Sequence, residues 1–136
     1  MVAILGSTMD VIKFFKDSRR MITVSAGEKL FSEGDRAKHM YVLIEGIADI
    51  YVGDTLVETA TPGAFLGEMA LVDSAPRSAA IVCRSQCRLV PIDVRQFDAL
   101  VRDAPEFARQ LMLLMSVRLR GMNERLKALQ ASSKVI

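Results

Sequence analysis

A series of short β-rich segments, each closed by a glycine turn, constrains this chain more than any other feature of its sequence. The glycines that close these segments are Gly27, Gly34, Gly46, Gly53 and Gly63. Many short strands separated by glycine turns favour an antiparallel sandwich or barrel over any helical bundle. We therefore predict a mostly β fold, an eight-stranded antiparallel β-roll (a double-stranded β-helix or jelly roll) over about residues 21–93.

One of these segments carries an alternating pattern that indicates a pocket. Ala48, Ile50 and Val52 alternate with Ile47, Asp49 and Tyr51. Successive side chains of a strand point to opposite faces. One face of this strand is therefore small and aliphatic, as the wall of a binding pocket would be.

Helical periodicity flanks the β-rich segments on both sides. Apolar residues at helical spacing predict a short N-terminal helix over about 8–19. The pattern returns after Ile92, where Asp93 is a suitable N-cap for a helix over about 94–102.

A longer helix is predicted over about 104–130, with Asp103 as its cap and Pro105 in its first turn. Its apolar residues form two strips. One of them follows a heptad spacing, which is typical of a seam between helices. Either both strips pack on the roll, or the heptad strip pairs with the same helix of a second chain, which we favour. The heptad strip consists of Met112, Met115, Leu119, Met122, Leu126 and Leu129.

Composition narrows the class of protein. The 136 residues suit one domain, 1–136, and a content of 51% hydrophobic and 25% charged residues argues against disorder. A net charge of +2 is too small to indicate direct nucleic-acid binding. No apolar run reaches the roughly 18 residues of a membrane span, and the start lacks the basic region of a signal peptide. We therefore expect a cytoplasmic protein.

The residues of catalytic and metal sites are scarce. The chain has a single histidine, His39, and no clustered ligands, so we predict no metal site, no cofactor, no catalytic residues and no enzyme activity. Cys83 and Cys87 lie on either side of a three-residue separator that fits a hairpin loop. We interpret them as two free, packed thiols.

The stretch "GEMALVDSAPRSAA", residues 67–80, places an acid, an arginine and a hydroxyl close together. A short helix after Gly67 would direct free backbone N–H groups at an anion, and Gly67 has no side chain to block the approach. The guanidinium of Arg77 matches phosphate oxygens, and Ser78 adds a hydroxyl donor. These residues predict a site for one phosphate.

A carboxylate at Glu68 would repel that phosphate, so its presence makes sense if it accepts a hydrogen bond from a hydroxyl of the same ligand. A sugar 2′-OH beside a phosphate, in an aliphatic pocket, indicates a nucleoside monophosphate. The alternative is an ordinary ion pair between Glu68 and Arg77, a kind of contact that contributes little stability at a surface.

The stretch "GAFLGEMALVDSAPRSAAIV" closely resembles the phosphate-binding cassette of cyclic nucleotide-binding domains, and the resemblance extends over about residues 10–130. It implies that Glu68 binds the ribose 2′-OH, that Arg77 binds the cyclic phosphate, and that the last helix closes over the base. The ligand it implies is cAMP or cGMP, with cAMP favoured. The residues it implies around the ligand are Gly67, Glu68, Met69, Ala70, Arg77, Ser78 and Ala79, with Ile50, Val57, Phe65, Arg118 and Asn123 as further candidates.

The family resemblance also implies a mechanism and its limits. Ligand would shift the last helix against the roll, which makes the chain a non-catalytic sensor with an unknown downstream effector. The end at Ile136 leaves no room for a helix-turn-helix domain, and whether the chain is complete or an excised domain stays open. The alternative function is a ligand-free β-roll that serves as a dimerisation or protein-interaction module.

Overall fold

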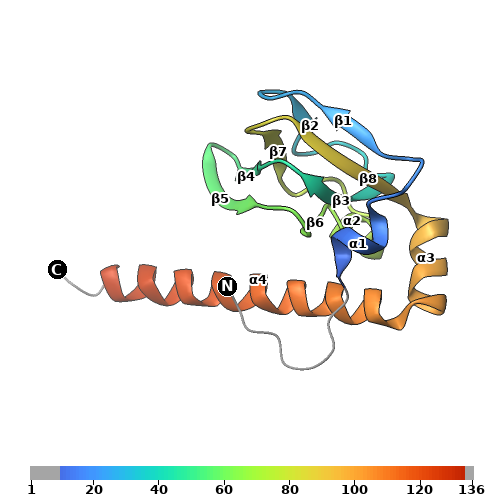
Figure 1. Ribbon diagram of the computed structural model, residues 1–136. Coiled ribbons are helices and arrows are strands. Elements are labelled where there is room, and N and C mark those ends of the chain that lie inside the picture. Colours follow the sequence, from blue (N-terminus) through green and yellow to red (C-terminus); the bar gives the residue numbers. More distant parts are fainter. Residues whose placement is uncertain (1–9, 134–136) are drawn as a thin grey trace.

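The computed structural model describes residues 10–133, and in that range eight strands form two four-stranded antiparallel sheets (Figure 1). One sheet has the order β1-β8-β3-β6, and the other has the order β2-β7-β4-β5. The predicted antiparallel β-roll is confirmed, and it consists of two separate sheets. The strands are β1 Ile22–Val24, β2 Lys29–Phe31, β3 His39–Glu45, β4 Ala48–Val52, β5 Thr55–Ala60, β6 Phe65–Leu66, β7 Ala80–Cys83 and β8 Cys87–Asp93.

Two apolar clusters hold the sheets and helices together. The cluster between the sheets contains residues of both, among them Leu43 and Leu89 of one sheet and Ala48 and Ile81 of the other. The second cluster joins the outer face of the β3–β8 pair to the helices, with Phe107 fully buried at its centre. Each fully buried side chain of this size stabilises the fold by roughly 1.5–3 kcal/mol.

The turn after β3 requires glycine. Gly46 has φ +99°, and a Cβ built on it would lie 2.3 Å from the carbonyl oxygen of Gln86 and 2.8 Å from Sγ of Cys87. Because this region of φ is strained for residues with a Cβ and a backbone atom fills the space, no other residue fits without moving the chain.

The three-residue separator between the two cysteines does not form the hairpin loop that its length fits. Cys83 ends β7 in one sheet and Cys87 begins β8 in the other, so the chain changes sheet between them. Both thiols are free and buried, which confirms the interpretation as packed thiols. Burial, together with a hydrogen bond to Cys87, raises the pKa of the Cys83 thiol to about 12, so it stays protonated.

The N-terminal helix is shorter than predicted. Helix α1 spans Val11–Phe15, where the Asp10 side chain accepts a hydrogen bond from the Lys13 N–H at 3.0 Å. Residues 8–9 of the prediction lie outside the described residues. The extension to residue 19 was wrong, and the Ser18 hydroxyl instead accepts the Arg20 N–H at 3.2 Å. Such local bonds offer the backbone an alternative to the helix.

Helix α3, Val94–Asp103, follows β8 directly and is capped as predicted. The Asp93 carboxylate accepts the Gln96 N–H at 2.8 Å, and the Gln96 side chain accepts the Asp93 N–H at 2.9 Å. This reciprocal capping box satisfies two N–H groups that the helix itself leaves free.

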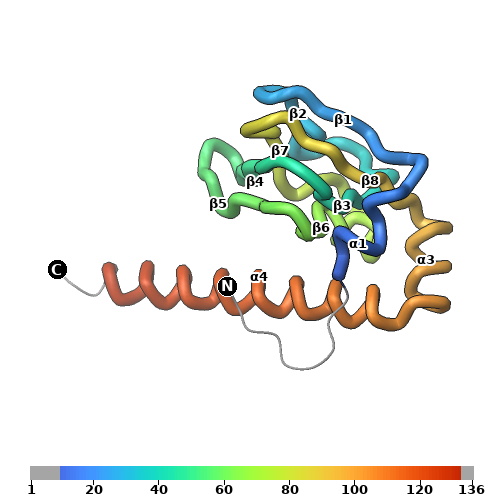
Figure 2. Tube along the Cα trace, viewed as in Figure 1, coloured from blue at the N-terminus to red at the C-terminus, as the bar shows by residue number. Residues whose placement is uncertain are grey.

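Helix α4 spans Pro105–Ser133, close to the predicted range. The prediction that Asp103 caps it was wrong, because Asp103 ends α3 and its carboxylate accepts two N–H groups of Arg102. The break falls at Ala104, since the residue before a proline avoids helical angles. Figure 2 shows α4 lying along one side of the roll, with its C-terminal end extending past the β4–β5 hairpin.

Candidate functional site

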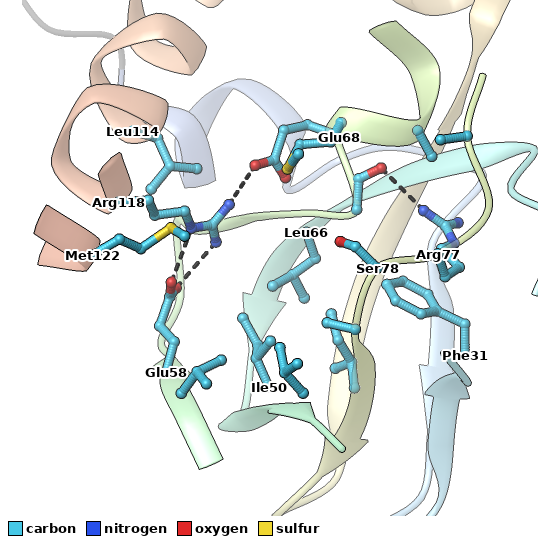
Figure 3. Close-up of a pocket in the computed structure, with 18 of the residues that line it drawn as sticks. Phe31, Ile50, Glu58, Leu66, Glu68, Arg77, Ser78, Leu114, Arg118 and Met122 are labelled. Carbon is cyan, nitrogen blue, oxygen red and sulfur yellow. Dashed lines mark hydrogen bonds and ion pairs between the residues drawn. The ribbon is translucent and has the colours of Figure 1, made fainter. Parts of the chain in front are cut away.

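A cavity of about 490 Å³ lies between the β2-β7-β4-β5 sheet, helix α2 and helix α4 (Figure 3). Helix α2, Met69–Asp73, begins directly after Gly67 and Glu68. The size falls within the range of small-molecule sites, which is about 300–1,000 Å³. Its lining is mostly apolar, and the polar exceptions include Glu58, Glu68, Arg77, Ser78, Arg118 and Arg125.

Arg77 is almost fully buried at one end of this cavity. Its Nη1 donates to the Gly67 carbonyl at 3.0 Å and its Nη2 to the His39 carbonyl at 2.5 Å, while the guanidinium lies 3.9 Å from the centroid of the Phe31 ring. Burial lowers the pKa of Arg77 from its ordinary value. The buried guanidinium also has one donor, Nε, without an acceptor.

Gly67 is needed here because of Arg77. Its φ is +72°, and a Cβ at this position would lie 2.3 Å from Nη1 of Arg77 and 3.2 Å from the Phe31 ring. The sequence predicted that the missing side chain leaves space for a ligand. In the structure, the space is taken by the guanidinium itself.

Glu68 is also buried, with an exposed fraction of 3%. Its Oε1 accepts Nη1 of Arg118 at 2.5 Å, and its Oε2 has no partner. The ion pair between Glu68 and Arg77 that the sequence left open is therefore replaced, among the described residues, by a pair with an arginine fifty positions further on.

Arg118 reaches into the cavity from α4 and binds two acids at once. Its Nε and Nη2 donate to the two carboxylate oxygens of Glu58 on β5, at 2.9 and 3.0 Å (Figure 3). Nη2 also donates to the Phe65 carbonyl at 2.9 Å. Burial acts to lower the pKa of Arg118, but the bonds to Glu58 and the charge of Glu68 outweigh burial and raise it.

Most of the residues predicted around a ligand line this cavity. Phe65 and Asn123 do not line it. The Phe65 side chain is buried in the core, with its ring centroid 5.3 Å from that of Phe107, and Asn123 is exposed on α4. The predicted residues that line the cavity are Gly67, Glu68, Met69, Ala70, Arg77, Ser78, Ala79, Ile50, Val57 and Arg118.

Sequence reasoning missed Glu58 and Arg125. Arg125 donates to the Val57 carbonyl, one heptad after Arg118, so α4 is tied to β5 at two points. The spacing of seven between the two arginines was a readable sign that both lie on one helix face. Nothing in the β5 sequence marks Glu58, because acids are common on the exposed face of an edge strand.

The described residues contain no group of three or more histidine, cysteine and acidic side chains placed to hold a metal ion. Within the same range, no helix is both long and apolar enough to cross a membrane.

Comparison with known proteins adds independent findings. A family model described as "Cyclic nucleotide-binding domain" matches residues 21–104. Rap guanine nucleotide exchange factor 3 of Mus musculus is 35% identical over 80 residues, which is 57% of this chain and 9% of that protein. A cAMP-dependent protein kinase regulatory subunit of Eremothecium gossypii is 33% identical over 70 residues, 52% of this chain and 15% of that protein. The chain thus spans under one sixth of either relative.

Among solved structures, the catabolite activator protein of Thermus thermophilus superimposes with a TM-score of 0.72 at 27% identity, over 81% of this chain and 54% of that one. The family match covers more than half of the sequence and includes the roll, helix α2, helix α3 and the residues around Arg77. The chain therefore belongs to the cyclic nucleotide-binding domain family, whose members generally serve as regulatory sensor modules.

Proposed function

We propose that the cavity binds one 3′,5′-cyclic nucleoside monophosphate, with cAMP preferred over cGMP, and that the protein senses this ligand without hydrolysing it. The observation that carries the proposal is the pair of buried atoms without partners, Nε of Arg77 and Oε2 of Glu68. Both residues line the same cavity. Buried polar groups are nearly always hydrogen-bonded, so two such orphans in one pocket indicate a missing partner.

The two orphans have opposite character, which restricts the ligand. Nε of Arg77 is a cationic donor suited to a phosphate oxygen, and Oε2 of Glu68 is an acceptor suited to a hydroxyl. The phosphate would replace the neutral carbonyls that Arg77 now contacts, and the exposed Ser78 hydroxyl would assist. The other lining arginines, Arg118 and Arg125, already have protein partners, which favours one phosphate over several.

The apolar lining supports a purine base, and a relative supports the preference for cAMP. Ile50, Val52 and Val57 present an aliphatic surface suited to the face of a purine. The related regulatory subunit of Eremothecium gossypii belongs to a cAMP-dependent kinase. Ser78 permits either base, so we propose that both nucleotides bind and that cAMP binds more tightly than cGMP.

Coupling to α4 is part of this function. Leu114, Arg118 and Met122 line the cavity from α4, so a ligand would contact that helix and the roll together. If the ligand binds more tightly when α4 takes one position against the roll than when it takes another, binding shifts α4 toward the first position. The effector that reads this movement, and a cytoplasmic location, stay predictions.

We further propose a homodimer through the heptad strip of α4. Met115 packs partly against the core, but the other five members of the strip are exposed. An exposed apolar strip of this length is typical of an interaction surface. The exposed members are Met112, Leu119, Met122, Leu126 and Leu129.

Calorimetric titration with cAMP and cGMP tests the function directly. We expect saturable binding of both, with cAMP tighter, and chromatography of the recovered ligand should show it unchanged. Arg77→Ala should weaken binding by about a hundredfold or more, since bonds from a charged donor contribute about 1.5–3 kcal/mol each.

The matched control is Arg88→Ala, which removes an exposed arginine paired with Glu45 and should leave binding intact. If neither nucleotide gives heat at millimolar concentration, the ligand-free interaction module becomes the better interpretation.

A further inference from the structure

Glu58 on β5 has no role in the proposed ligand contacts, yet it binds Arg118 through both of its carboxylate oxygens. Its two carboxylate oxygens accept Nε and Nη2 of Arg118 at 2.9 and 3.0 Å. This two-pronged geometry fixes the plane of a guanidinium, which a single contact does not. Both side chains are partly shielded, with exposed fractions of 32% for Glu58 and 22% for Arg118.

The position of Arg118 decides how Glu68 is held. Arg118 offers five N–H donors, and Glu58 and the Phe65 carbonyl occupy three of them. Only Nη1 is directed at Glu68, and it takes Oε1 alone. Oε2 is therefore left buried and without a partner beside the cavity, while Oε1 is held in place.

We propose that Glu58 is a positioning residue for ligand binding: it holds Arg118 so that Glu68 presents one free oxygen to the sugar hydroxyl. This inference rests on the proposed function, because it assumes that Glu68 binds the 2′-OH. Without Glu58, the guanidinium is free to turn its two-pronged face to Glu68 and occupy both oxygens. Both oxygens of the acid would then be bonded to Arg118, which would close it to the ligand.

The arrangement also links sugar recognition to α4. Glu58 belongs to β5, Glu68 precedes α2, and Arg118 comes from α4. A correctly placed Glu68 oxygen therefore requires that α4 lie against the roll. The preference for cAMP over its 2′-deoxy analogue therefore reports whether α4 lies against the roll.

The test compares cAMP with 2′-deoxy-cAMP, which lacks the hydroxyl that Glu68 would bind, with the cGMP pair run in parallel. Wild-type protein should prefer cAMP by about tenfold or more, the contribution of one hydrogen bond to a charged acceptor. Glu58→Gln keeps the size of the side chain but removes the charge and one acceptor. We expect it to lower that preference about fivefold or more.

The preference is informative because general damage to the pocket would weaken both ligands together and leave their ratio unchanged. Glu45→Gln is the matched control, since Glu45 is an exposed acid paired with Arg88 at 3.2 Å and does not line the cavity. It should keep the wild-type preference.

A second variant tests the route through Arg118. Arg118→Met should lower the preference by itself, and adding Glu58→Gln to it should lower the preference no further, because the two residues act in one chain of contacts. An additive loss in the double variant would mean that Glu58 contacts the ligand independently and would overturn the positioning role.

The remaining outcomes separate this inference from the proposed function. If wild-type protein prefers cAMP and Glu58→Gln keeps that preference, the positioning role is wrong and the binding function stands. Equal wild-type affinities for cAMP and 2′-deoxy-cAMP would overturn the contact between Glu68 and the sugar, and with it this inference. Absence of any binding would overturn the proposed function itself.

Discussion

Two buried acids in this protein have nearly the same exposure and opposite surroundings. Asp49 on β4 has an exposed fraction of 8%, and Glu68 before α2 has 3%. Asp49 accepts Nη2 and Nε of Arg84 at 2.7 and 3.0 Å, and the Thr59 hydroxyl at 3.0 Å. Glu68 accepts one bond and has one oxygen without a partner.

The difference separates an acid whose two oxygens are both bonded from an acid that we propose binds the ligand. The hydrogen bond from Arg84 holds the pKa of Asp49 below its ordinary value, so the acid stays charged and ties β4 to β5 and to the segment after β7. Glu68 forms an ion pair with Arg118 through one oxygen, and its other oxygen has no hydrogen-bond partner. Burial alone would not distinguish the two acids, whereas counting satisfied oxygens does.

The largest effects on stability and affinity are expected from Gly46, which precedes the strand of Asp49, and Gly67, which precedes Glu68. Gly46→Ala would push a Cβ into the Gln86 backbone at a positive φ, so we expect a loss of about 3 kcal/mol or more in folding free energy. Gly67→Ala would push its Cβ into the far end of the Arg77 side chain and not into backbone, so ligand affinity should fall far more than stability. Chemical denaturation and calorimetry on both variants measure the contrast.

Equal losses of stability in the two glycine variants would mean that Gly67 is a structural glycine like Gly46. The pocket would then be part of the core and would not be held in reserve for a ligand.

A smaller effect is expected when each acid is made neutral. Asp49→Asn should lower the melting temperature and leave nucleotide affinity unchanged, because Asp49 does not line the cavity. Glu68→Gln should lower affinity for cAMP about tenfold and change the melting temperature little, since Arg118 keeps Glu58 as a partner. A fall in affinity in the Asp49 variant would remove the distinction between the two acids.

The smallest effect is expected from Leu126 in the heptad strip of α4, which does not line the cavity, although Met122 of the same strip does. Leu126→Ser changes a residue with an exposed fraction of 54%, so folding should be nearly unaffected. If the heptad strip forms a dimer, the variant should sediment as a monomer at concentrations where wild type is dimeric. A wild-type protein that is monomeric at every concentration would contradict the dimer. It would not bear on the proposal that α4 contacts the ligand in the cavity.

The elements of the fold were predictable because their causes are local. Alternation in β4, the glycine turns, the Asp93 cap and the heptad spacing of α4 all depend on neighbours within a few residues. The errors fell where two local preferences competed. At Ser18, a side-chain bond replaced a helical turn. At Ala104, the proline that follows broke the helix, so Asp103 became the last residue of α3 and not the cap of α4.

Half of the site had the same local origin. Gly67, Glu68, Arg77 and Ser78 lie within twelve residues, and the chemistry of that stretch indicated an anion and a hydroxyl without any structure. Their surroundings could not be predicted in the same way. That Arg77 rests on Phe31, and that Phe65 enters the core instead of the cavity, depend on how the sheets pack.

The sequence by itself determined which stretch carries the proposed binding residues and what kind of ligand suits them, since residue type and short spacing set that chemistry. Only the tertiary structure decided that Glu58, Glu68 and Arg118 meet, because their contacts join positions fifty and sixty residues apart. Long-range contacts of this kind are fixed by the packing of α4 on the roll. No local pattern at any of the three positions records that packing.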